Sequence, residues 1–180
     1  DAVRDGHAAA VVSAGNTGAL MAMAKFVLKT LPGISRPAIA AILPTARGET
    51  AMLDLGANIQ CDAENLVQFA VMGEVFARTV LGLERPIIGL LNIGVEDLKG
   101  VEAVREAAVI LRETTLPIVF KGFIEGNDIT EGTVDVVVTD GFTGNVALKT
   151  AEGTASLYTN FLRDAFKSSW MSKLGYLLAK

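Results

Sequence analysis

Short apolar runs alternate along this chain with longer segments in which apolar residues recur every three or four positions. The short runs predict buried strands at residues 9–12, 38–43, 51–55, 86–91, 118–120 and 134–138. The longer segments predict helices at residues 19–28, 62–80, 101–111 and 142–168. Strands that alternate with helices indicate an α/β fold with three layers, α/β/α, around a largely parallel sheet.

The helix predicted at residues 62–80 has defined ends and two apolar faces. Asp62 is a favourable N-cap, and Gly82 is a favourable residue for ending the helix. One face carries Leu66, Phe69, Gly73, Phe76 and Val80, and another carries Val67, Val71 and Val75. Such a helix is typically covered on both sides, by layers or by subunits. Together with the apolar stripe of the last helix, which ends at Phe166, it predicts a dimer formed through helices.

Composition narrows the class of protein. The length of 180 residues suits a single α/β domain over residues 1–180, and a hydrophobic fraction of 51% favours a doubly covered sheet, a large oligomer interface, or both. The net charge of −4 argues against a general nucleic-acid binder. A single cysteine, Cys61, excludes an internal disulfide and predicts a cytoplasmic protein. We find no signal peptide and no bilayer-spanning apolar run, and the abrupt ends predict an excised fragment.

Two glycine-rich segments, residues 13–18 and 139–145, each follow a predicted strand and precede a predicted helix. Small residues at this position let backbone N–H groups approach a ligand, and the helix N-terminus adds a partial positive charge. Each segment also carries an asparagine and threonine. The pair therefore predicts a site that binds phosphate or another oxyanion through its geometry.

Polar residues also follow the other predicted strands, at residues 54–58, 92–97 and 122–128. Because ligands of such sheets bind beyond the carboxyl ends of the strands, we expect these segments to converge on one cleft.

Each polar candidate also has a purely structural interpretation. Asn16 and Thr17 either donate to an oxyanion or cap the following helix. Asp54 and Asp140 either orient a ligand or cap turns, and turn capping is the more common role. Lys149, one helical turn beyond Asn145, either neutralises a phosphate or is a solvated surface residue.

Other kinds of catalytic chemistry lack a sequence motif. His7 precedes the first predicted strand and has no obvious aspartate partner, and the charges of Asp62 and Glu64 are expected to disfavour a Cys61 thiolate. The sequence has no metal-ligand motif, no nucleophile elbow, no phosphate-binding loop with a lysine and no dinucleotide fingerprint. We therefore expect neither a metal nor a cofactor.

Four motifs together resemble the PlsX family of bacterial phosphate acyltransferases. They are SAGNTGALM at residues 13–21, LDLGAN at 53–58, GLLNIGVEDLKG at 89–100 and DVVVTDGFTGNVALK at 135–149. They occur in the family's order and cover most of the chain. The family's early Asp-Ala-Met-Gly-Gly-Asp segment and its C-terminal glycine-rich portion with His-Gly are missing here.

The resemblance implies transfer of a fatty acyl group from acyl carrier protein to inorganic phosphate, giving acyl phosphate for phospholipid synthesis. It also implies a homodimer with a fold similar to the isocitrate and isopropylmalate dehydrogenases and phosphate acetyltransferases. Two alternatives stay open. One is a short-chain phosphate acyltransferase, and the other is a truncated, non-catalytic fragment that dimerises or binds acyl carrier protein.

Phosphate is already an anionic nucleophile, so such an enzyme needs chiefly to position it and to stabilise the developing oxyanion. We assign the catalytic roles to Asn16, Asp140, Asn145 and Lys149. The residues expected to bind phosphate or the acyl group are Ser13, Gly15, Thr17, Gly18, Asp54, Asn58, Asn92, Thr143 and Gly144.

The last segment combines apolar and aromatic residues with lysines, a composition typical of elements at a membrane interface. The residues expected to contact lipid are Trp170, Leu174, Tyr176 and Leu177. Packing inside a dimer is the alternative. We expect reversible contact with the inner face of the cell membrane.

Overall fold

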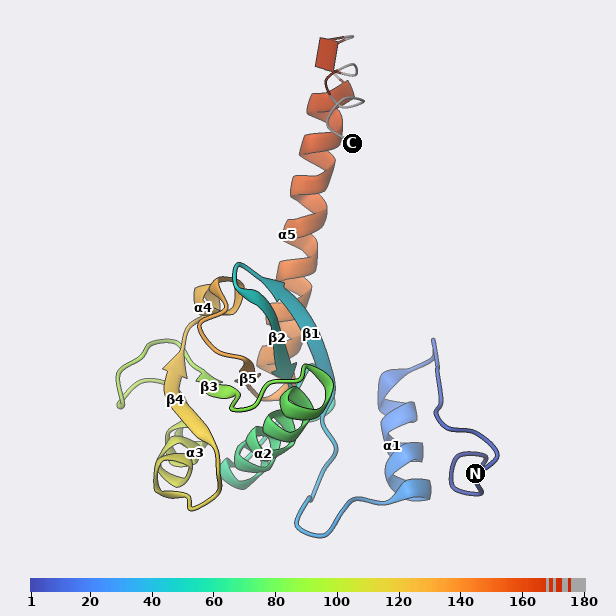
Figure 1. Cartoon of the computed structure of the whole chain (residues 1–180), viewed down its shortest axis with the longest axis vertical. Helices are drawn as coiled ribbons and strands as arrows, with labels where there is room; N and C mark the ends of the chain where they lie inside the picture. The colour runs from blue at the N-terminus through green and yellow to red at the C-terminus, as the bar shows by residue number, and fades with distance from the viewer. Residues whose placement is uncertain (168, 170, 173–174, 176–180) are drawn as a thin grey trace. The chain divides into compact units, whose positions relative to one another are not determined.

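A computed structural model describes residues 1–167, 169, 171, 172 and 175 of the chain (Figure 1). The chain divides into two compact units, Asp1–Asn145 and Val146–Lys180. The first unit contains the sheet and all the residues that line the pocket described below.

The sheet has five strands in the order β1-β2-β5-β3-β4. The strands are β1 (Ala40–Thr45), β2 (Gly48–Leu53), β3 (Ile87–Leu91), β4 (Val119–Ile124) and β5 (Val136–Val138). β1 and β2 form an antiparallel hairpin, whereas the β2–β5, β5–β3 and β3–β4 pairs are parallel. The prediction of an α/β fold with a largely parallel sheet is confirmed.

The central strand of the sheet, β5, is completely buried. The three valines of β5 are all 0% exposed, and they pair with β2 on one side and β3 on the other. A strand covered on both faces favours such a continuous run of β-branched residues. This short strand fixes where the following segment, residues 139–145, leaves the sheet.

The helices are α1 (Thr17–Leu28), α2 (Ala63–Val80), α3 (Glu102–Glu113), α4 (Gly126–Glu131) and α5 (Gly141–Lys167). α2 and α3 lie side by side and pack on the sheet (Figure 1). Gly73 lets α2 approach β5 closely, because a Cβ there would lie 2.5 Å from the Val136 side chain. Within the described residues, no helix is long and apolar enough to cross a membrane.

The predicted ends of α2 are confirmed. The Asp62 side chain accepts a hydrogen bond from the Asn65 N–H, and the helix ends at Val80. Gly82 follows with a φ of 71°, a left-handed conformation that glycine adopts at little cost.

Two predictions about local structure are wrong. Residues 9–12 form no strand, because no strand in the described sheet pairs with them. Val12, within this segment, is 100% exposed. The strand predicted to end at residue 120 continues to Ile124 as β4, and residues 126–131, for which no helix was expected, form the short helix α4. Reciprocal capping between Glu125 and Asp128 stabilises its start, and six residues are too few to show a helical period.

Candidate functional site

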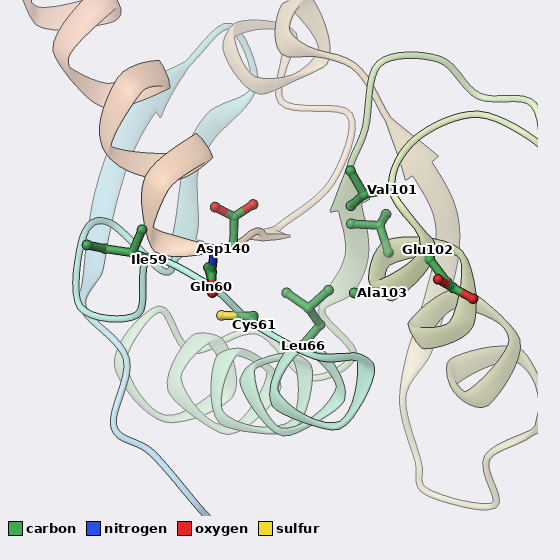
Figure 2. Close-up of a pocket in the computed structure, with 9 residues that line it drawn as sticks. Ile59, Gln60, Cys61, Leu66, Val101, Glu102, Ala103 and Asp140 are labelled. Atoms are coloured by element: carbon green, nitrogen blue, oxygen red, sulfur yellow. The ribbon is translucent and has the colours of Figure 1, made fainter.

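A pocket of about 450 Å³ lies at the carboxyl ends of the central strands (Figure 2). One wall comes from the segment that leads into α2, and the opposite wall comes from the start of α3. Asp140, two residues after the end of β5, completes the pocket. The lining residues are Ile59, Gln60, Cys61, Leu66, Val101, Glu102, Ala103, Val104 and Asp140. The pocket therefore lies where ligands of parallel sheets usually bind.

Asp54 organises the loop beside this pocket. Its side chain is fully buried, and one carboxylate oxygen accepts hydrogen bonds from the N–H groups of Ile39 (2.9 Å) and Ala57 (3.1 Å). The other oxygen accepts from the backbone N–H (2.6 Å) and side-chain amide (2.8 Å) of Asn58. These four bonds support the turn-forming interpretation of Asp54, which is enclosed by protein donors.

Asn58 extends the same network. Its side-chain amide also donates to the Pro37 carbonyl oxygen at 2.8 Å, and its own carbonyl oxygen accepts from the Gly141 N–H at 2.8 Å. Asn58 thus connects the segment before β1 to the first turn of α5. A role in substrate binding stays a prediction for this residue.

Two glycines let the first turn of α5 lie directly on the 54–58 loop. A Cβ at Gly141 would lie 2.8 Å from the Asn58 carbonyl oxygen, and one at Gly144 would collide with the Asp54 carbonyl oxygen. Asn145 lies next to Gly56, with its side-chain oxygen 3.8 Å from where a Cβ on that glycine would be. The structure therefore brings Asn145 together with the Asp54 loop.

The N-terminal N–H groups of α5 are largely used within the protein. The Asp140 carboxylate accepts from the Thr143 N–H at 2.9 Å and from its hydroxyl at 2.7 Å. The Gly144 N–H donates to the Asp140 carbonyl oxygen at 2.9 Å. Asp140 is thus a helix cap, and the Asn145 side chain is a better candidate donor to an oxyanion than these N–H groups.

The first glycine-rich segment has a different local structure. Asn16 caps α1 by accepting from the Ala19 N–H at 3.0 Å, and the Ser13 hydroxyl oxygen accepts from the Gly15 N–H at 3.1 Å. Thr17 and Gly18 are exposed at the start of α1. No residue of this segment lines the pocket, so a site shared by the two glycine-rich segments stays a prediction.

Asn92 closes the loop after β3. Its side-chain amide donates to the Lys99 carbonyl oxygen at 3.0 Å, and a Cβ at Gly100 would collide with its side chain. The Arg105 guanidinium donates to the Gly100 carbonyl oxygen at 2.8 Å. Arg105 does not stand out in the sequence, because an arginine inside an amphipathic helix usually faces solvent.

Lys149 belongs to the second unit. Its ammonium group lies 2.7 Å from a Glu152 carboxylate oxygen, and its side chain is 64% exposed. A role in neutralising phosphate stays a prediction.

The Cys61 thiol is protonated at neutral pH. Burial, and then the negative charges of Asp54 and Asp140, raise its pKa to about 11. The direction agrees with the sequence prediction, but the responsible charges differ from the expected Asp62 and Glu64. A protonated thiol is a poor nucleophile, so Cys61 acts as a small apolar wall residue.

Within the described part of the chain, no group of three or more His, Cys, Asp or Glu residues is placed to hold a metal ion.

The fold is that of a phosphotransacetylase-like α/β protein. The chain is similar to a solved structure described as EutD phosphotransacetylase from Staphylococcus aureus, with a TM-score of 0.63 and 20% identity. The similarity covers 86% of this chain and 54% of that one. At this identity the likeness establishes the fold.

The chain also matches a protein family over its whole length. Residues 1–180 match the family described as fatty acid synthesis protein, and the chain belongs to it. The chain is 67% identical to the phosphate acyltransferase of Paramagnetospirillum magneticum, over 100% of this chain and 51% of that protein. It is 70% identical to the phosphate acyltransferase of Rhodospirillum centenum, over 99% of this chain and 50% of that protein. It thus spans about half the length of these curated relatives.

We expect Asp54→Asn to lower the free energy of unfolding by about 3 kcal/mol. Both carboxylate oxygens of Asp54 accept hydrogen bonds from N–H groups, and the substitution replaces one of these acceptors with an NH₂ group, which can only donate. Urea denaturation followed by circular dichroism measures the change. Asp135→Asn is the matched control. Its carboxylate accepts one backbone hydrogen bond, from Ile87 at 2.7 Å, which an amide oxygen can replace. Equal losses in the two variants would contradict a special role for Asp54.

Proposed function

We propose that the protein containing this chain transfers a fatty acyl group from acyl carrier protein to inorganic phosphate, giving acyl phosphate for phospholipid synthesis. The observation that carries the proposal is the family match across residues 1–180, together with relatives named phosphate acyltransferase at 67% and 70% identity. The phosphotransacetylase-like fold supports the same class of reaction.

The reaction needs little chemistry from protein side chains. A phosphate oxygen attacks the thioester carbonyl carbon, a C–O bond forms, and the carbonyl oxygen becomes an oxyanion. Collapse of this intermediate breaks the C–S bond, and the leaving thiolate takes up the proton that hydrogen phosphate brings to the reaction. The protein supplies orientation, exclusion of water and donors to the oxyanion.

Asn145 is the best-supported donor in the described structure. It lies on the first turn of α5, which two close-packed glycines and the buried Asp54 network hold in place. Asp140 acts as a positioning residue by capping that turn. Ser13, Asn16 and Thr17, which are exposed residues at the start of α1, are the proposed second contribution to phosphate binding.

We expect Asn145→Ala to reduce kcat by tenfold to a thousandfold in the full-length enzyme, the range for loss of one oxyanion donor. Acyl phosphate formed from palmitoyl acyl carrier protein and phosphate is trapped with hydroxylamine and measured. Asn127→Ala is the matched control, because Asn127 is an exposed residue of α4 outside the pocket. Near-normal turnover of Asn145→Ala would contradict its role.

The same assay separates the alternatives. Activity confined to acetyl thioesters would indicate a short-chain phosphate acyltransferase. Tight binding of acyl carrier protein without product would indicate a non-catalytic binding protein.

We also propose a homodimer formed through helices. Apolar side chains remain exposed on α2, including Val75 (45%) and Val80 (57%), and separately on the second unit, including Leu157 (50%) and Phe161 (58%). Exposed apolar residues on helices are typical of subunit interfaces. Light scattering at micromolar concentration is expected to give the mass of a dimer, and a stable monomer would contradict the proposal.

The last segment is proposed to make reversible contact with the inner face of the cell membrane, which places the protein in the cytoplasm. Trp170, Leu174, Tyr176 and Leu177 lie outside the described residues, so the proposal depends on composition. Leucine and aromatic side chains partition into the interface, and the neighbouring lysines are attracted to anionic lipid.

We expect Leu174→Glu and Leu177→Glu to weaken co-sedimentation of the full-length protein with anionic phospholipid vesicles. We also expect added salt to weaken the binding of the wild type to these vesicles. Leu98→Glu is the control, since Leu98 is 90% exposed in a distant part of the sequence. Equal binding by all forms, or no binding by the wild type, would favour packing as the role of the segment.

A further inference from the structure

The pocket beside α2 and α3 is poorly suited to an anion. None of its nine lining residues is Lys, Arg or His, and two of them, Glu102 and Asp140, carry carboxylates. After burial, the negative charges of Asp54 and Asp140 also raise the pKa of the Cys61 thiol, which shows that both carboxylates act on this wall of the pocket. A phosphate ion placed here would meet like charges without a cationic side chain to offset them.

Two of the polar side chains in the pocket wall, Asp140 and Cys61, already have hydrogen-bond partners. Both carboxylate oxygens of Asp140 accept hydrogen bonds from Thr143. The Cys61 thiol donates to the Asn58 carbonyl oxygen at 3.5 Å. A polar ligand would therefore gain few new hydrogen bonds from these side chains.

Five of the nine lining residues are aliphatic, and the polar Gln60 and Glu102 are exposed. Leu66 lies between the two walls, with Cys61 on one side and Val101 and Ala103 on the other (Figure 2). A volume of about 450 Å³ falls within the range of small-molecule sites, which are mostly apolar. The volume of the pocket and its aliphatic side chains fit a segment of an uncharged hydrocarbon chain.

We propose that this pocket holds part of the acyl chain of the thioester substrate and that phosphate binds outside it. The inference rests on the proposed acyl transfer to phosphate. The pocket separates the apolar substrate from the anionic one, because its carboxylates disfavour phosphate while its aliphatic wall accepts methylene groups. Asn145, next to Gly56, provides a polar group outside the pocket lining.

Two substitutions narrow the pocket from opposite walls, Ala103→Leu from α3 and Cys61→Leu from the segment before α2. Both residues are half-buried. The matched control is Val109→Leu, which enlarges an exposed residue of α3 outside the pocket. Thermal unfolding of each variant establishes that it is folded, and either narrowing variant alone suffices for the test.

Binding is measured first, independently of turnover. The probe is methyl cis-parinarate, a fluorescent and uncharged acyl chain, added to the full-length protein. We expect the narrowing variants to raise its Kd by about tenfold, the effect of misfitting one or two methylene-sized groups, while Val109→Leu and millimolar phosphate leave it unchanged. Equal Kd values for the wild type and a folded narrowing variant, or displacement of the probe by phosphate, would overturn the proposal.

Turnover then separates this proposal from the proposed function. With octanoyl and palmitoyl acyl carrier protein, we expect narrowing to lower kcat/KM for palmitoyl about tenfold more than for octanoyl and to leave KM for phosphate within twofold. A raised KM for phosphate with an unchanged chain-length preference would overturn the acyl assignment. Absence of acyl phosphate in the wild type, together with the expected probe binding, would contradict only the proposed reaction.

Discussion

The buried carboxylate of Asp54 is the interaction on which the candidate site depends. A charge without exposure to water must be compensated by hydrogen bonds, and here four N–H groups from Ile39, Ala57 and Asn58 supply them. The same bonds fix the loop after β2 and the segment before β1. The need to compensate the buried Asp54 carboxylate therefore determines the backbone path of both segments.

The first turn of α5 uses that fixed loop as its packing surface. Gly141 and Gly144, three residues apart and so on one helical face, leave room for the backbone of residues 54–58. Asp140 caps the turn, and Asn145 follows beside Gly56. The glycine-rich motif after β5 thus allows the first turn of α5 to pack closely on the 54–58 loop. Any contact of this motif with a ligand depends on that packing.

The elements with strong local patterns could be predicted from sequence, and those that depend on distant partners could not. Asp62 and Gly82 mark the ends of α2 because capping is a local interaction. Residues 9–12 have strand-like composition, but a strand also needs a neighbour with which to pair. The cause of the raised Cys61 pKa was missed for a similar reason, since Asp54 and Asp140 approach the thiol only in the folded chain.

The sheet order has a consequence for solubility. β1 and β4 are the outer strands of the described sheet, and outer strands offer unpaired backbone groups to other chains. β1 contains Pro44, which has no N–H to donate, and β4 contains the exposed Lys121, whose charge would be unfavourable inside an intermolecular ladder. Both margins of the described sheet thus carry a feature that disfavours edge-to-edge aggregation.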